Sequence, residues 1–302
     1  MVSIIVPFAV KHNNDVNLHN WPNQDLGYSI YNTIQCIKNI NDVLDIEKEI
    51  ILVDNTNNFP NIKIPNLKIV KGWQYLTESE IKSKKNFDKY KINNFKNLSM
   101  WVSMAYNIGI ENAKGDYIIL QHNDIHYHTN LIPNLIHNLE FHSYGYISAD
   151  YKKLSISGYL GNKETIDNII DDIQVGYEDG GFIKTKYLGF ADCYFFLCKK
   201  EFFDDYHVDW EYGDSNHGAT IKCLNKDIPF LHIGPYYDNP NFPTKNTMRT
   251  YEFNNKNFIT HLKGGFSENK LAYRRYDNKI PYTDEIFNYI NLINGSTHNI
   301  ST

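Results

Sequence analysis

Two side chains that can bind a divalent metal ion lie only two residues apart in this sequence. They are His122 and Asp124, in the segment Gln121-His122-Asn123-Asp124 that directly follows the apolar run 116–120. A carboxylate oxygen suits Mg²⁺ or Mn²⁺, and an imidazole nitrogen suits Mn²⁺ better. In an extended chain these two residues face the same side, which favours a shared metal ion. Spacing alone leaves open an aspartate that hydrogen-bonds its own backbone in a turn.

The segments that must position these side chains predict an α/β fold. Residues 3–8 and 49–54 are short apolar runs rich in β-branched residues, which is typical of strands buried in the centre of a sheet. Between them, residues 24–40 carry apolar side chains at a helical period. Strand, helix and strand in this order form a βαβ unit, and such units cross over right-handed in a parallel sheet.

Further elements extend this pattern along the chain. We predict strands at 67–70, 116–120, 146–148 and 228–232, and helices at 98–112 and 214–224. In open α/β sheets, ligands bind beyond the carboxyl ends of the strands. Phe8, Asp54 and Asp124 lie at such ends, so we expect them to converge on one crevice. The chain shows no internal repeat and no flexible linker, which predicts one domain over 1–235, divided at about residue 125, and a C-terminal extension over 236–302 that packs on it.

The bulk composition narrows the class of protein. The 302 residues carry a formal net charge of −5 without a block of like charges, so we expect no duplex nucleic acid as a partner. No apolar stretch approaches the roughly 18 residues that span a bilayer, and a strand-like run opens the sequence, so we expect a cytoplasmic protein. The four cysteines form no CxxC pair, which argues against a zinc site and a disulfide framework.

The segment from Ala105 to Ile125 resembles the "aRNxGixxAkGeyixflDsDd" segment of glycosyltransferase family 2. Residues 2–8 resemble the opening "vSiIiPty" strand of that family, and residues 49–57 resemble its "eiivvDdgStD" segment. The resemblance covers about 2–235. It implies the GT-A fold, a Rossmann-like, mostly parallel central sheet flanked by helices. His122 stands in place of the first Asp of the family's DxD, as in an HxD subgroup, and Tyr106 replaces the arginine of "aRN".

The resemblance implies a donor site for a nucleoside-diphosphate sugar, with a UDP-linked donor expected. Pro7 and Phe8 would line the nucleobase pocket, and Asp54 would bind the base or the ribose. The other donor-binding positions implied are Asn55, Asn107, His122 and Asn123. Mn²⁺ or Mg²⁺ would be held by Asp124, by His122, and by His232 at the end of the strand 228–232, where the family often has a metal-binding histidine.

On the acceptor side, the segment 210–214 resembles the family's "ED" region at the start of a helix. Asp214 is therefore the candidate general base, with Glu211 in reserve. Asp214 could also be only the N-cap of that helix, and the two roles are compatible because a carboxylate has several lone pairs. Asp192, in a segment that resembles an acceptor-side strand of the family, and Trp210 are candidate contacts for the acceptor.

The activity that follows from the resemblance is an inverting, metal-assisted transfer of a sugar to a hydroxyl of a glycan or another acceptor. Where a glycan is assembled on a membrane, the enzyme would attach peripherally. Two alternatives remain open. A carbohydrate- or nucleotide-binding protein without turnover is supported by His122 and Tyr106. A sugar-nucleotide nucleotidyltransferase would need a GxGxR loop after the first strand, and residues 7–11 contain none.

Overall fold

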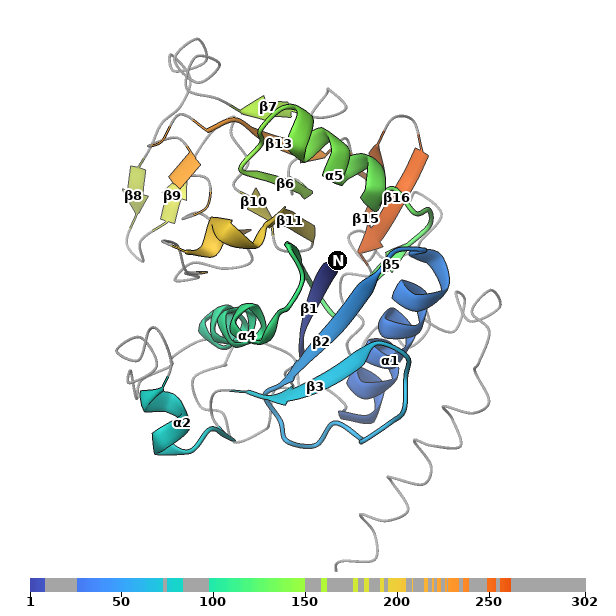
Figure 1. Ribbon diagram of the computed structural model, residues 1–302, viewed down its shortest axis with the longest axis vertical. Coiled ribbons are helices and arrows are strands. Elements are labelled where there is room, and N and C mark those ends of the chain that lie inside the picture. Colours follow the sequence, from blue (N-terminus) through green and yellow to red (C-terminus); the bar gives the residue numbers. More distant parts are fainter. Residues whose placement is uncertain are drawn as a thin grey trace, which may run out of the picture.

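The structure is a computed structural model of the chain, and Figure 1 shows its arrangement. It describes residues 1–8, 26–72, 75–83, 98–149, 159–161, 176–178, 182–184, 191–192, 195–204, 208, 215–216, 219, 222–223, 226, 228–233, 236–238, 249–253 and 256–261.

An eight-stranded sheet forms the centre of the molecule, in the order β3-β2-β1-β4-β11-β6-β13-β7. Strands β3, β2, β1 and β4 run parallel to one another, β11 is antiparallel between β4 and β6, and β7 is antiparallel to β13 at the edge. This arrangement confirms the predicted mostly parallel sheet. The strands are β1 (Val2–Phe8), β2 (Lys48–Asp54), β3 (Leu67–Lys71), β4 (Tyr117–Gln121), β6 (Tyr146–Ala149), β7 (Tyr159–Gly161), β11 (Phe195–Lys199) and β13 (Phe230–Ile233).

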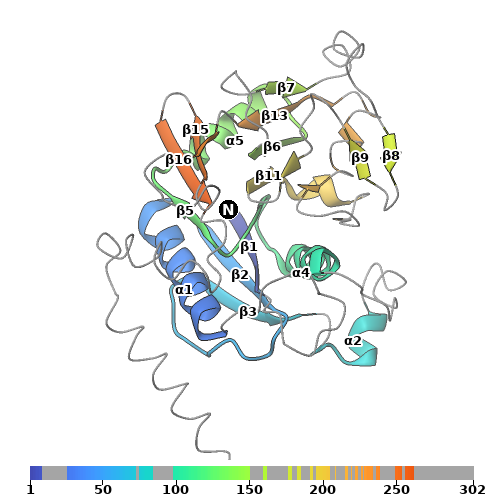
Figure 2. The same ribbon diagram turned by 180° about the vertical axis from the view of Figure 1, so that it is seen from behind.

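Helices cover both faces of the sheet, and α1 and α4 lie on opposite sides of β1 and β2 (Figures 1 and 2). The helices are α1 (Leu26–Val43), α2 (Glu78–Lys82), α4 (Leu98–Asn112), α5 (Ile132–Phe141) and the short η3 (Lys200–Phe203). In the part of the chain that the structure describes, no helix combines the length and hydrophobicity needed to cross a bilayer.

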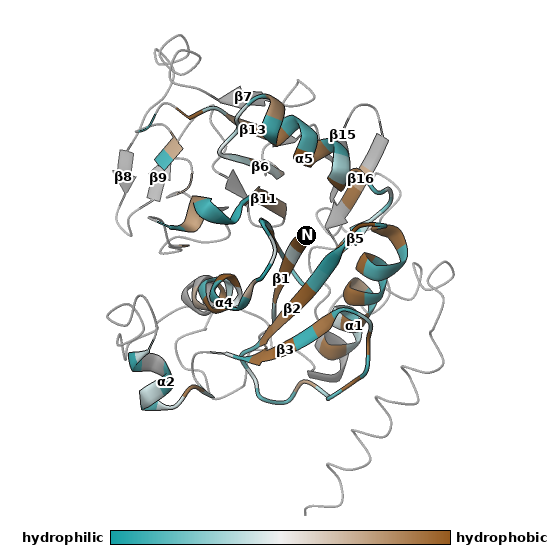
Figure 3. Ribbon diagram, in the orientation of Figure 1, coloured by the Kyte–Doolittle hydropathy of each residue, from teal (hydrophilic) through white to brown (hydrophobic). Residues whose placement is uncertain are grey.

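The alternating side chains of β1 divide the core into two layers. Val2, Ile4, Val6 and Phe8 pack into one buried cluster with the apolar side of α1, and Ile5 packs into a second cluster with α4. Gly109 of α4 allows the closest approach, because a Cβ there would lie 2.2 Å from Ile5 Cγ2. Figure 3 shows hydrophobic colour along β1 and hydrophilic colour at the amino end of β2.

A second sheet joins the C-terminal part of the chain to the site region. Its order is β14-β15-β16-β5, with strands β14 (Tyr236–Asp238), β15 (Arg249–Phe253), β16 (Lys256–His261) and β5 (Ile125–Tyr127). Phe258 of β16 packs edge-on against Tyr127 and Phe195, with ring centroids 5.7 and 5.0 Å apart. Strand β16 therefore contributes to the main core, although the sequence after Pro235 shows no strong period.

Two short antiparallel pairs complete the described strands. They are β8 (Gly176–Glu178) with β9 (Phe182–Lys184), and β10 (Ala191–Asp192) with β12 (Ser215–Asn216).

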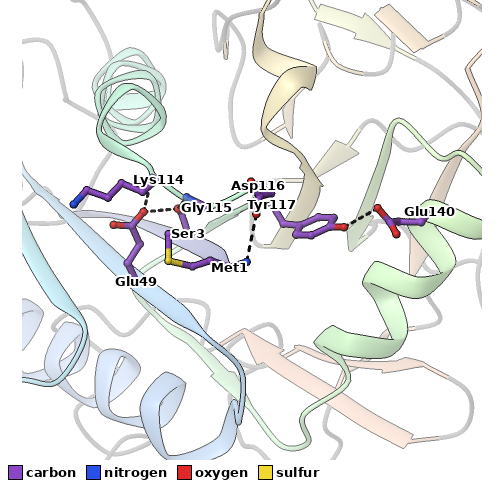
Figure 4. A network of polar contacts seen from close by, with 8 residues as sticks. All are labelled: Met1, Ser3, Glu49, Lys114, Gly115, Asp116, Tyr117 and Glu140. Carbon is purple, nitrogen blue, oxygen red and sulfur yellow. Dashed lines mark hydrogen bonds and ion pairs between the residues drawn. The ribbon is translucent and has the colours of Figure 1, made fainter.

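A network of hydrogen bonds fastens the amino ends of the central parallel strands (Figure 4). Ser3 is fully buried; its hydroxyl donates to Glu49 Oε1 at 2.6 Å and accepts from the Gly115 backbone N–H at 2.7 Å. The Lys114 backbone N–H also donates to Glu49 Oε1, at 2.5 Å. The α-amino group of Met1 lies 3.5 Å from the Asp116 carboxylate. The loop before β4 is thereby tied to both β1 and β2.

The same network continues to helix α5. The Tyr117 hydroxyl donates to Glu140 Oε1 at 2.6 Å (Figure 4), and Lys199 Nζ lies 3.3 Å from the same oxygen. The hydrogen bond to this carboxylate raises the pKa of Tyr117 to about 12 and lowers the pKa of Glu140.

Candidate functional site

The predicted donor-site residues follow the carboxyl ends of three adjacent strands. Strand β1 lies between β2 and β4, and Phe8 is in register with Asp54. The Asn55 backbone N–H donates to the Phe8 carbonyl at 2.8 Å, which fixes these two strand ends to each other. Pro7 and Phe8 are both buried, and the Phe8 ring meets the Phe59 ring edge-on at 4.9 Å.

The carboxylate of Asp54 is occupied by the turn that follows β2. Its Oδ1 accepts from the backbone N–H of Thr56 at 2.8 Å and from the Thr56 hydroxyl at 2.7 Å, and its Oδ2 accepts from the Phe59 N–H at 2.9 Å. An aspartate that bonds its own backbone after a strand, which spacing left open for Asp124, is thus the arrangement at Asp54. Its role as a base or ribose ligand stays a prediction.

In contrast to Asp54, the next residue, Asn55, has a side chain whose polar atoms form no hydrogen bonds. Its side chain is 1% exposed, and both its Oδ1 and its Nδ2 are buried without a hydrogen-bond partner. Gly72 lies against it so closely that a Cβ at that position would be 2.0 Å from Asn55 Oδ1. The Asn55 amide therefore has one acceptor and two donors whose hydrogen-bonding capacity is unused.

The segment 121–127 does not continue as an extended chain past β4. Strand β4 ends at Gln121, Asn123 and Asp124 form a turn, and β5 begins at Ile125. The chain is therefore not extended from His122 to Asp124, as the argument for a shared side required, and a metal ion shared by these two residues stays a prediction. Asp124 is buried, with 8% of its surface exposed, and His122 is partly exposed.

Helix α1 holds this turn and the strand after it through two polar side chains that are six residues apart. Asn123 Nδ2 donates to Thr33 Oγ1 at 2.9 Å. Asn39 exchanges two hydrogen bonds with the backbone of Tyr127: the Tyr127 N–H donates to Asn39 Oδ1 at 2.6 Å, and Asn39 Nδ2 donates to the Tyr127 carbonyl at 3.0 Å. The amide of Asn123, a predicted donor ligand, is thus also a link between the turn and α1.

Cys36 lies between these two residues on α1 and faces the same turn. Burial, and after it the charge of Asp124, raise the pKa of the Cys36 thiol well above its usual value. Gln121 Nε2 lies 3.3 Å from the Cys36 sulfur, and the Tyr127 hydroxyl donates to Gln121 Oε1 at 2.6 Å. Cys36, Gln121 and Tyr127 therefore form a cluster of neutral, hydrogen-bonded groups close to the turn that contains Asp124.

His126 is a functional candidate that the sequence analysis did not identify. Its side chain is 6% exposed, and its Nε2 is buried without a hydrogen-bond partner. Burial lowers the pKa of His126 to about 4, against the opposing effect of the Asp124 carboxylate, which raises it. A signal was present in the sequence, because His122, Asp124, His126 and His128 occupy every second position.

Oxygen and nitrogen donors suited to a divalent cation are present in this region. Asp124 provides a buried carboxylate, and His126 provides a buried nitrogen without a partner. Within the described residues, no three His, Cys, Asp or Glu side chains are grouped so that they could hold a metal ion. A cation in a phosphate-transferring site commonly takes one or two protein ligands and completes its shell with phosphate oxygens and water, which fits this pair.

The backbone of His232 lies farther along the sheet. Two strands, β11 and β6, separate β13 from β4, which corresponds to about 14 Å at the usual strand spacing. His232 is in register with Ser148 and Tyr159, and β13 continues to Ile233, so His232 is not the last residue of its strand. Its role as a metal ligand stays a prediction.

On the acceptor side, Asp214, Glu211 and Trp210 lie outside the described residues, and both flanks of their segment are described. Asp192 pairs with Ser215 in the β10–β12 ladder. Because Ser215 and Asn216 form a strand, the predicted helix does not begin at Asp214, and the proposed N-cap is wrong. Pairing with β10 has overridden the local capping signal.

Asn107 of α4 binds Val208, which lies just before the segment 209–214. Its Nδ2 donates to the Val208 carbonyl at 2.9 Å, and its Oδ1 accepts from the Val208 N–H at 3.0 Å. The predicted donor ligand Asn107 thus uses both amide groups to fix the backbone that enters 209–214.

No protein-family model matches the chain, and no curated protein matches its sequence. Among solved structures, TarS 1-349 of S. aureus in complex with UDP is similar, with 11% identity, a TM-score of 0.39, and coverage of 85% of this chain and 59% of that one. The mannosyltransferase PcManGT from Pyrobaculum calidifontis in complex with GDP-Man and Mn²⁺ has 13% identity, a TM-score of 0.39, and coverage of 78% and 54%.

A third similar structure, the bifunctional IspDF from Campylobacter jejuni, has 9% identity and a TM-score of 0.37, and the match covers 73% of this chain and 47% of that one. The chain thus spans about half to three fifths of the length of these proteins. At such low identities and TM-scores, the function has to be argued from the residues of this chain.

Proposed function

We propose that this protein is a glycosyltransferase that moves a sugar from a nucleoside-diphosphate sugar to an acceptor hydroxyl. The observation that carries the proposal is the pair of unlike polar groups that follow β2 and β4. Asn55 offers a buried amide with unused hydrogen-bonding atoms, and Asp124 offers a buried carboxylate. With β1 between them, the two strand ends are about 10 Å apart at the usual strand spacing.

These two groups match the two ends of a nucleoside diphosphate. The Asn55 amide can pair with a base or ribose, which present donors and acceptors together. The Asp124 carboxylate suits a divalent cation on the diphosphate, and Mn²⁺ or Mg²⁺ bound there would neutralise the charge of the leaving group. The resemblance of the flanking segments to glycosyltransferase family 2 supports the same division of roles, with a UDP-linked donor preferred.

Two described contacts support the acceptor half of the proposal. Asn107 holds Val208, and the β10–β12 ladder holds Ser215, so both flanks of 209–214 are tied to the folded core. In that ladder the backbone of Asp192 pairs with the residue after Asp214. Asp214 accepts the proton of the acceptor hydroxyl as the hydroxyl attacks the anomeric carbon, with inversion, and Asp192 and Trp210 bind the acceptor.

Turnover of a donor panel tests the proposal. The full chain is incubated with UDP-, GDP- and dTDP-linked sugars and Mn²⁺, and the released nucleoside diphosphate is measured. We expect slow hydrolysis of at least one donor, and we expect Asp124→Ala and Asp214→Ala to abolish it while both variants keep a cooperative thermal transition. Binding of a donor without release from the wild type would identify a binding protein, and release that persists in Asp124→Ala would refute the assigned site.

A further inference from the structure

His126 is the middle residue of β5 and follows Asp124 by two positions. Its neighbours in the strand, Ile125 and Tyr127, are members of the buried cluster that packs on α1. Because side chains alternate along a strand, His126 is directed to the other side. The charge of the Asp124 carboxylate, two residues earlier, acts on the His126 imidazole and raises its pKa against the effect of burial.

The buried Nε2 of His126 has no hydrogen-bond partner, which makes the fold less stable. A buried polar atom without a partner costs about 1–3 kcal/mol of stability, and such atoms are uncommon in folded proteins. Mn²⁺ accepts an imidazole nitrogen more readily than Mg²⁺ does, so an Mn²⁺ ion shared by His126 and Asp124 would supply the missing partner. The carboxylate would supply the charge.

We propose that His126 provides a nitrogen ligand, through Nε2, to the divalent cation that Asp124 binds together with the donor diphosphate. This inference rests on the proposed function. The site is completed by the phosphate oxygens, so the protein alone binds the cation weakly and the nucleotide strengthens its binding. The expected metal is Mn²⁺ in preference to Mg²⁺, because Mg²⁺ favours an all-oxygen shell.

The cation is detected directly by electron paramagnetic resonance of Mn²⁺ bound to the full chain, with UDP as the nucleotide. Electron-spin-echo modulation reports a nitrogen nucleus bonded to the metal, independently of any turnover. We expect nitrogen modulation in the wild type and its loss in His126→Gln. The Mn²⁺ affinity of His126→Gln should fall by at least about tenfold, since even the outer partners of metal ligands are worth that much.

Two matched variants complete the experiment. His137→Gln removes an exposed histidine of α5 and should leave the signal unchanged. His232→Gln tests the histidine predicted from the sequence, and we expect it to keep the nitrogen modulation. Thermal unfolding of each variant checks the fold, and the wild-type spectrum alone can refute the proposal if His126→Gln does not fold.

The outcomes separate the two levels of the proposal. Mn²⁺ that binds with UDP but shows no nitrogen modulation, or modulation that persists in His126→Gln, overturns the role of His126 and leaves the proposed function intact. Modulation lost only in His232→Gln assigns the nitrogen to that residue instead. If UDP, GDP and dTDP all fail to promote Mn²⁺ binding to the wild type, both the role of His126 and the metal-assisted reaction are refuted.

Discussion

The two ends of the parallel strands differ in whether they contain buried polar atoms without hydrogen-bond partners. At the amino end, the Ser3 hydroxyl both donates and accepts, and Glu49 accepts from two donors. At the carboxyl end, Asn55 and His126 contain buried polar atoms without partners. Each such atom costs about 1–3 kcal/mol. This difference agrees with the proposed function, in which the amino end serves stability and the carboxyl end binds the donor.

The largest expected effect is that of Asp124→Asn on turnover. The amide cannot provide a charged oxygen to a cation on the diphosphate, so donor hydrolysis should fall by about 100-fold or more, as when one stabilising group is removed from a transition state. The melting temperature should change little. Glu49→Gln makes the same chemical change at the amino end and should leave turnover as it is. Turnover at the wild-type rate in Asp124→Asn would contradict the assignment of the carboxyl end to donor binding.

The second largest effect is that of Gly72→Ala. The new Cβ would lie 2.0 Å from Asn55 Oδ1 and 2.6 Å from Asn55 Cα, so the amide must move. Overpacking of this kind costs about 1–3 kcal/mol, measured by urea denaturation, and the affinity for UDP, measured by calorimetry, should fall as well. Gly115→Ala is the matched control, because its Cβ would lie 2.7 Å from Ser3 N. That variant should lose stability and keep its UDP affinity.

Glu49→Gln tests whether the amino end of the parallel strands serves stability alone. The carboxylate accepts from the Ser3 hydroxyl and the Lys114 N–H, and charge-assisted hydrogen bonds are stronger than neutral ones. We expect a loss of about 1–2 kcal/mol in the free energy of unfolding, measured by urea denaturation, with unchanged turnover of the folded enzyme. Reduced turnover at unchanged stability would show that the amino end belongs to the functional site.

The smallest effect concerns the pH dependence of the Tyr117–Glu140 contact. Because the folded pKa of Tyr117 is raised from 10.0 to about 12, the stabilisation is fully present below pH 10 and is lost as the pH rises toward 12. An absorbance titration of tyrosinate, taken as the difference between wild type and Tyr117→Phe, should show this late ionisation. In Glu140→Gln the pKa of Tyr117 should return toward 10, and a transition that stays near 12 would exclude Glu140 as the cause.

Local patterns in the sequence predict the elements that carry the donor site. The apolar runs at 3–8, 49–54 and 116–120 gave the central strands, and the helical period gave α1. The Asn-rich stretch after Asp54 is typical of a turn, and Asn57 there has a φ of +54°. These features follow from side chains close in sequence, so a single stretch is enough to reveal them.

The parts that could not be predicted depend on residues far apart in sequence. Strand β5 pairs with β16, more than a hundred residues later, and no local pattern marks the pairing. The strand at Ser215 depends on its pairing with Asp192, which overrides a good N-cap signal at Asp214. The turn at Asn123 depends on Thr33 of α1. The spacing of His122, His126 and His128 likewise does not reveal that His126 is buried, because burial depends on residues distant in sequence.

The free energy of unfolding with and without UDP and Mn²⁺ tests the contrast between the two ends most directly. It is measured for the wild type, Ser3→Ala and Asn55→Ala. A ligand at 100 times its Kd adds about 2.7 kcal/mol to stability. Ser3→Ala should lose about 1–3 kcal/mol without ligand and keep the whole increment.

Asn55→Ala should keep its stability without ligand to within about 1 kcal/mol and should lose about 1.4 kcal/mol of the increment, which corresponds to tenfold weaker binding. The opposite result would contradict the division between the two ends: an Asn55→Ala protein that is destabilised like Ser3→Ala and gains the full increment from UDP and Mn²⁺.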